Sequence, residues 1–109
     1  MKISGLLEIG DFQLLTSSNY TDREITGCYI GDLLSWVMGR AKPGDAWITI
    51  MNNINIIAVA TLTDCSCIIL SEGVKLEDDI IKKADSEGII VIKSEKTSYE
   101  ISCKLHEEI

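Results

Sequence analysis

The sequence is poor in proline, histidine and basic residues. It has one proline, one histidine and ten Lys and Arg among 109 residues, against 17 Asp and Glu, so its formal net charge is −7 at pH 7. Phosphate backbones and anionic membrane surfaces bind proteins through clustered basic side chains, which this chain lacks. We therefore expect no nucleic acid and no membrane surface as a partner.

Long apolar runs and catalytic motifs are also absent. The longest apolar stretch, residues 54–60, is far shorter than the roughly 18 residues that a membrane helix needs. The first residues lack the apolar segment and cleavage site of a signal peptide, so we expect a cytoplasmic protein. No P-loop pattern occurs, and the lone His106 has no nucleophile and carboxylate arranged around it. We predict that the protein is not an enzyme and uses no cofactor.

The four cysteines have a spacing that is unusual for a zinc site. Cys65 and Cys67 form a C-x-C pair, whereas Cys28 lies 37 residues before it and Cys103 lies 36 residues after it. Structural zinc ligands usually come in pairs that are separated by two to four residues. We interpret the cysteines as reduced, small, buried side chains and expect no metal; a redox or metal site on the C-x-C pair is the least favoured alternative.

The composition is that of one globular domain. With 46% hydrophobic and 25% charged residues, a chain of 109 residues can bury one core but not two. We therefore expect a single domain over residues 1–109.

Glycines and polar turns divide the chain into alternating helices and strands. The apolar spacing predicts helices at 3–9, 33–38, 54–62, 76–84 and from 97 onward, and strands at 12–16, 25–30, 46–50, 67–70 and 89–92. Continuous apolar strands that alternate with helices are typical of parallel sheets covered on both faces. The sequence therefore predicts an α/β fold, a small three-layer domain with a mainly parallel sheet.

Several local signals refine these helices. We expect Asp32 to cap the second helix and Asn52 or Asn53 to cap the third, while Thr97 and Glu100 form a capping-box pattern at the start of the last. The second helix should turn a stripe toward the core, made of Leu33, Leu34, Val37 and Met38. The fourth helix is spaced for two ion pairs, Asp78/Lys82 and Asp79/Lys83.

Residues 47–60 and 67–73 resemble the DRTGG domain, and residues 22–38 resemble its stand-alone bacterial members of about 110 residues. The resemblance implies a fold similar to the N-terminal domain of HPr kinase/phosphorylase, without the separate kinase domain. Because those members occur beside iron-hydrogenase genes, it also implies a role accessory to a redox or metabolic enzyme. Where the family motif has Gly-Asp-Arg and Thr-Gly-Gly, this sequence has residues 51–53 (Met-Asn-Asn) and 71–73 (Ser-Glu-Gly), so only the last glycine is kept.

Two polar loops follow predicted parallel strands, at the edge where such sheets usually bind ligands. One carries Asn52, Asn53 and Asn55 at the start of a helix, whose free N–H groups suit a phosphate or carboxylate. The other loop consists of Ser71, Glu72 and Gly73. These six residues are the candidate ligand-binding site, for a small anionic ligand. The alternative is that they only cap a helix and form a turn.

Large aromatic residues indicate a candidate interface. Trp36 and Trp47 are demanding to place together in one small core, and Tyr29 lies between Gly27 and Gly31, which allow close approach by a partner chain or ligand. We expect Tyr29, Trp36 and Trp47 to form a homodimer interface; the alternative is a strand that simply leads into a capped helix.

These features together predict a non-catalytic regulatory or protein-interaction module. We expect a homodimer that binds a protein partner or a small anionic ligand. The alternative is a domain that senses an adenine nucleotide or another small ligand with the two polar loops.

Overall fold

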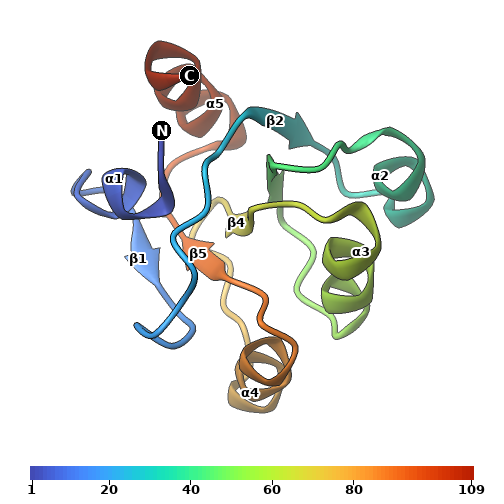
Figure 1. Ribbon diagram of the computed structural model, residues 1–109. Coiled ribbons are helices and arrows are strands. Elements are labelled where there is room, and N and C mark those ends of the chain that lie inside the picture. Colours follow the sequence, from blue (N-terminus) through green and yellow to red (C-terminus); the bar gives the residue numbers. More distant parts are fainter.

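The computed structural model describes residues 1–109 and contains one five-stranded sheet and five helices (Figure 1). In chain order the elements are α1 (Ile3–Leu7), β1 (Gln13–Leu14), β2 (Gly27–Ile30), α2 (Leu34–Arg40), β3 (Asp45–Thr49), α3 (Asn55–Thr63), β4 (Cys67–Leu70), α4 (Asp78–Ser86), β5 (Val91–Lys93) and α5 (Ser98–Glu108). The predicted alternation of helices and strands is confirmed.

The strands lie in the order β1-β5-β4-β3-β2. The strands β2 to β5 are parallel, and only β1 runs antiparallel, beside β5. Consecutive parallel strands are neighbours, so α2, α3 and α4 each connect two adjacent strands. Figure 1 shows these three helices on one side of the sheet and α1 and α5 on the other. The predicted three-layer α/β domain with a mainly parallel sheet is therefore confirmed.

Alternate residues of the central strands supply two separate cores. Trp47, Ile68 and Val91 pack with residues of α2, α3 and α4, whereas Ile48 and Ile69 pack on the opposite face with residues of α1 and α5. Every residue of β3 and β4 is buried. Burial on both faces explains why these strands are continuous apolar runs in the sequence.

The structure buries Trp47 completely, so the prediction that it belongs to an interface is wrong. Its indole Nε1 donates a hydrogen bond to the carbonyl of Gly31 at 2.8 Å. That bond satisfies the one polar atom of the side chain, which removes the cost of burying it. The small core therefore needs to hold only one tryptophan, because Trp36 lies outside it and is 55% exposed.

The predicted cap at Asp32 is wrong because its side chain has other partners. The carboxylate of Asp32 accepts hydrogen bonds from the Thr49 hydroxyl at 2.8 Å and from the Ile50 N–H at 3.0 Å, so it ties two strand ends together. Helix α2 begins without a side-chain cap. The Asn53 cap is confirmed: Ile54 already has helical backbone angles, and the Asn53 side chain accepts the N–H of Asn55, two residues on, at 2.9 Å.

The capping box of α5 is confirmed, since the Thr97 hydroxyl accepts the N–H of Glu100 and the Glu100 carboxylate accepts the N–H of Thr97, both at 3.1 Å. The ion pairs predicted on α4 are wrong. Lys83 pairs one turn further on with Glu87 at 3.0 Å, across two exposed side chains.

The predicted apolar stripe of α2 is also only partly correct. Val37 is fully buried and Leu34 is half-buried, but Leu33 and Met38 are exposed. The helix has only seven residues and lies at the end of the sheet, beside the edge strand β2. It therefore packs against the core with one face only, and the apolar side chains on its other faces stay exposed.

The cysteines divide into two pairs. Cys65 and Cys67 are buried, as predicted, whereas Cys28 on β2 and Cys103 on α5 are exposed, so the prediction of burial is wrong for these two. None of the helices has the length and apolar character that crossing a membrane requires.

Candidate functional site

The loops at the carboxyl ends of β3 and β4 are brought together, but their polar groups bond mainly to the protein itself. The side-chain amide of Asn52 donates to the carbonyl of Lys75 at 3.0 Å and so links the two loops. Asn53 is used in the turn before α3. Asn55 lies exposed in the first turn of that helix.

The second predicted loop is bonded to the chain that follows β5. The N–H of Glu72 donates to the carbonyl of Lys96 at 2.8 Å, and the N–H of Gly73 donates to the carbonyl of Ser94 at 2.9 Å. The buried hydroxyl of Ser71 lies 2.8 Å from that of Ser98. Glu72 and Gly73 both have a left-handed backbone, with φ of 62° and 69°. These bonds close the loop against the end of β5.

The order of the strands explains why this edge is closed. A crevice opens at the carboxyl edge where adjacent strands lead to helices on opposite faces. The strands β2, β3 and β4 all lead to helices on the same face, and only β4 and β5 diverge. There the loops are joined by the hydrogen bonds of residues 71–73. Of the six predicted ligand-binding residues, only Asn55 lines a hollow, a shallow groove between α3 and α4.

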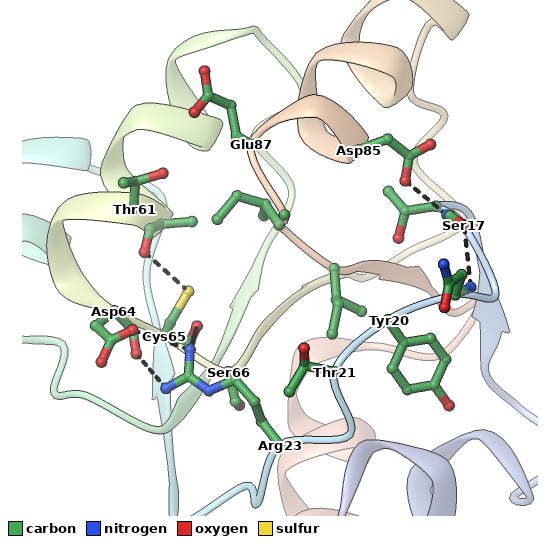
Figure 2. Close-up of a pocket in the computed structure, with 16 residues that line it drawn as sticks. Ser17, Tyr20, Thr21, Arg23, Thr61, Asp64, Cys65, Ser66, Asp85 and Glu87 are labelled. Atoms are coloured by element: carbon green, nitrogen blue, oxygen red, sulfur yellow. Dashed lines mark hydrogen bonds and ion pairs between the residues drawn. The ribbon is translucent and has the colours of Figure 1, made fainter.

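A pocket of about 330 Å³ lies at the opposite edge, where β4 and β5 begin (Figure 2). Its walls come from three segments: residues 16–23 between β1 and β2, residues 60–66 at the end of α3, and residues 85–90 at the end of α4. We call this hollow the amino-edge pocket. The fold assembles it from parts of the chain that are far apart in the sequence.

Arg23 forms one wall of the amino-edge pocket by binding the end of α3. Its Nη1 donates to Oδ1 of Asp64 at 3.0 Å and to the carbonyl of Cys65 at 3.1 Å, and its Nη2 donates to the carbonyl of Asp64 at 3.1 Å. Asp64 ends the helix with a left-handed backbone, φ 55°. The guanidinium thus interacts with the negative end of the helix dipole as well as with a carboxylate.

Asp85 holds the opposite wall. Its Oδ1 accepts the N–H of Ser17 at 2.7 Å, a link across 68 residues of sequence. The Ser17 hydroxyl in turn accepts the N–H of Asn19 at 3.1 Å. Figure 2 shows Asp85 and Ser17 on one side of the pocket and Arg23 and Asp64 on the other. Two polar links therefore fasten the irregular segment 16–23 to α3 and α4.

The thiols near the pocket are not activated. Burial raises the pKa of Cys65 to about 11, and burial likewise raises the pKa of Cys67 well above its usual range. Both thiols are therefore protonated near neutral pH and are weak nucleophiles. The amino-edge pocket contains no histidine, and His106 lies exposed on α5, outside its walls. The polar groups that line the amino-edge pocket are hydrogen-bonding side chains and carboxylates, which can bind a small molecule.

Sequence reasoning missed most of the pocket. Asp64, Asp85 and Glu87 belong to no motif that marks them as site residues. Asp85 and Ser17 become neighbours only when β1 inserts beside β5. The one usable signal was the polar run of residues 16–22, which marks a loop but does not show what it contacts.

The predicted interface residues lie in three different environments. Trp47 is in the core, Tyr29 is half-buried on the edge strand β2, and Trp36 is exposed on α2 with Arg40 stacked over its ring at 4.0 Å. Exposed apolar side chains are frequent in this part of the chain: Ile30, Leu33, Trp36 and Met38. We call these four residues the α2 apolar surface.

Comparison with known proteins identifies a family and a similar solved structure. The family model described as the DRTGG domain matches residues 6–107. No curated protein matches the chain. Among solved structures, the CBS and DRTGG domains of the regulatory region of Clostridium perfringens pyrophosphatase, complexed with the activator diadenosine tetraphosphate, are similar with a TM-score of 0.70 and 16% identity. The match covers 93% of this chain but 44% of that one, and at this identity it shows a shared fold.

Proposed function

The chain belongs to the DRTGG domain family, and we propose that residues 1–109 form one non-catalytic regulatory domain that binds a small ligand in the amino-edge pocket. The observation that supports this most directly is the pocket itself. Three distant segments meet around a hollow of about 330 Å³ that has polar walls and no activated thiol or histidine. A pocket of this size suits a small molecule.

The position of the pocket provides a means of reporting binding. Segment 16–23 has little regular structure and leads directly into the edge strand β2. Its links to α3 and α4 are the bonds of Arg23 with Asp64 and of Ser17 with Asp85. A ligand that contacts both walls would add to these links and so favour one arrangement of the segment.

Thermal denaturation with a panel of metabolites tests this function. A ligand at 100 times its Kd stabilises the folded state by about 2.7 kcal/mol, which shifts the midpoint by several degrees in a domain of this size. Thr21 lines the pocket, whereas Ser18 lies in the same segment outside it. We expect Thr21→Trp to abolish the shift and Ser18→Trp to keep it. A panel without any stabilising compound, or equal shifts in both variants, would contradict the proposal.

A homodimer is the second part of the proposal, and the α2 apolar surface supports it. Leu33 is 61% exposed and Trp36 is 55% exposed, beside an edge strand with no outer neighbour. Aromatic and apolar side chains are enriched at the centres of interfaces. If a different protein covers this surface instead, the family resemblance suggests the redox or metabolic enzyme that the domain regulates, in the bacterial cytoplasm.

Sedimentation at micromolar concentration tests the dimer. We expect Trp36→Ala to weaken self-association by at least tenfold, because truncating an aromatic anchor usually costs more than about 1 kcal/mol. Tyr99 on α5 is a matched control, since it is 76% exposed and lies outside the α2 apolar surface. A wild-type monomer at 100 μM, or an equal effect of Tyr99→Ala, would argue against a dimer through this surface.

An adenine nucleotide bound by the carboxyl-edge loops is the alternative function. The activator in the pyrophosphatase structure favours it, as do the N–H groups in the first turn of α3. Nucleotide binding that is lost in Asn55→Ala and kept in Thr21→Trp would support this alternative and assign the ligand to Asn52, Asn53, Asn55 and residues 71–73.

A further inference from the structure

We infer that the amino-edge pocket selects an organic cation, namely an ammonium or guanidinium group on a short apolar stem. This inference rests on the proposed function and specifies its ligand. It follows from the charge of the walls, from the way the protein already binds a guanidinium there, and from the apolar floor.

The charge of the walls favours a cation. The charged residues that line the pocket are one arginine, Arg23, and three carboxylates, Asp64, Asp85 and Glu87. Arg23 pairs with Asp64 and Lys83 pairs with Glu87, so Asp85 is the carboxylate without a basic partner. The carboxyl ends of two helices, α3 and α4, add the negative ends of their dipoles at Asp64 and Glu87. An anionic nucleotide would meet the same charge as a repulsion.

Arg23 shows how this edge binds a cation. Its guanidinium is held at 3.0 to 3.1 Å by one carboxylate oxygen and two main-chain carbonyls at the end of α3. On the other wall, Asp85 uses only Oδ1, for Ser17, and Glu87 uses only Oε1, for the exposed Lys83. Oδ2 of Asp85 thus remains as an acceptor for a ligand, whereas the carboxylate of Glu87 points away from the pocket (Figure 2).

The distribution of these carboxylates favours an organic cation over a metal ion. No three acidic, histidine or cysteine side chains of the structure converge on one point where a metal could bind. The floor between them is apolar and includes Ala60 and Ile89. A methylene stem can contact this floor while its charged ends reach the walls, as Lys and Arg side chains do on protein surfaces.

Isothermal titration of the full chain with matched probes tests the inference. The probes are 1,4-diaminobutane and its guanidinium analogue agmatine, the neutral isostere 1,4-butanediol, and the anions ATP and diadenosine tetraphosphate. We expect the two cations to bind at least tenfold more tightly than the diol, and to lose affinity between 50 and 500 mM NaCl as screening increases. We expect no binding of the anions in the pocket.

Charge-neutralising variants locate the bound cation. Asp85→Asn keeps an oxygen for the Ser17 N–H, and Glu87→Gln removes only an exposed ion pair, so both should fold. Asp85→Asn should weaken diamine binding by about fivefold, the effect of a charge at about 4 Å in a watery site, and Glu87→Gln should weaken it less because its carboxylate points away from the pocket. Glu108→Gln removes the same charge from the exposed end of α5 and should leave the affinity unchanged.

The possible failures are distinguishable. Butanediol or a nucleotide that binds as tightly as the diamine, and is blocked by Thr21→Trp, would overturn the inference and leave the proposed function intact. Diamine binding that is equal in Asp85→Asn, Glu87→Gln and Glu108→Gln would place the cation elsewhere and also overturn it. Absence of binding by every probe in both this panel and the metabolite panel would overturn both proposals.

Discussion

Replacing Trp47 by phenylalanine should destabilise the protein strongly, although it changes no surface residue. Trp47 is fully buried in the core formed with α2, α3 and α4, and its Nε1 is 2.8 Å from the carbonyl oxygen of Gly31. That bond joins β3 to the turn that follows β2. Phenylalanine retains the apolar ring but loses the donor and part of the volume.

The magnitude follows from these two losses. Leaving a partly buried carbonyl without its donor costs about 1–3 kcal/mol. Removing about 40 Å³ of side chain costs about 1 kcal/mol, at roughly 24 cal/mol per Å³ of cavity. We therefore expect Trp47→Phe to lower the free energy of unfolding by about 3 kcal/mol.

Urea denaturation followed by far-UV circular dichroism measures this effect without relying on tryptophan fluorescence. With an m-value of about 1.5 kcal/mol/M, a loss of about 3 kcal/mol lowers the midpoint by about 2 M. Trp36→Phe is the matched control. Trp36 is 55% exposed and stacks only with Arg40, so its replacement should cost less than about 1 kcal/mol. A shift below 0.5 M for Trp47→Phe, or an equal shift for both variants, would refute the account of the core.

Three further predictions concern local features. The hydrogen bonds from Thr97 hold the pKa of Glu100 below its ordinary value of 4.5. Their contribution to stability is therefore present above pH 4.5 and is lost as the pH falls through the folded-state pKa. In acid denaturation, the stability of Glu100→Gln should not show this decrease. Gly44→Ala should destabilise by about 1–2 kcal/mol because φ is +86°, whereas Gly39→Ala inside α2 should stabilise by about 0.5–1 kcal/mol, as measured by urea denaturation. The thiol of Cys67, buried and with a raised pKa, should react with a thiol reagent at pH 8 only as fast as the protein unfolds.

The parts of the fold that were predictable are those in which local pattern and tertiary environment agree. The run 67–70 was predicted as a strand buried on both faces and lies at the centre of the sheet as β4. Thr97 and Glu100 form their capping box because both partners lie within one turn of the same helix. Such features can be predicted without knowing which distant segments of the chain lie beside them.

The predictions that failed depend on distant partners. Asp32 has the position of a helix cap, but Thr49 and Ile50, which precede α3, offer it donors at a strand end. The sequence predicts Trp47 at an interface because two tryptophans are demanding to place in one small core, and composition does not show that the carbonyl of Gly31 accepts the hydrogen bond of its indole. In each case the competing bond is formed by residues 16 to 18 positions away.

The candidate site illustrates the same limit at the level of topology. The carboxyl edge is the usual location of ligands in parallel sheets only where neighbouring strands send their helices to opposite faces. Here α2, α3 and α4 lie on one face, and each connects the end of one parallel strand to the start of the next. Their carboxyl ends therefore point together toward the amino edge, where Asp64 and Glu87 follow α3 and α4. A parallel sheet with three successive helices on one face therefore places the negative ends of the helix dipoles beside the amino-edge pocket. The predicted preference for anions depends on the helix N-termini at the carboxyl edge of the sheet. The charge of the preferred ligand therefore distinguishes binding at the carboxyl edge from binding in the amino-edge pocket.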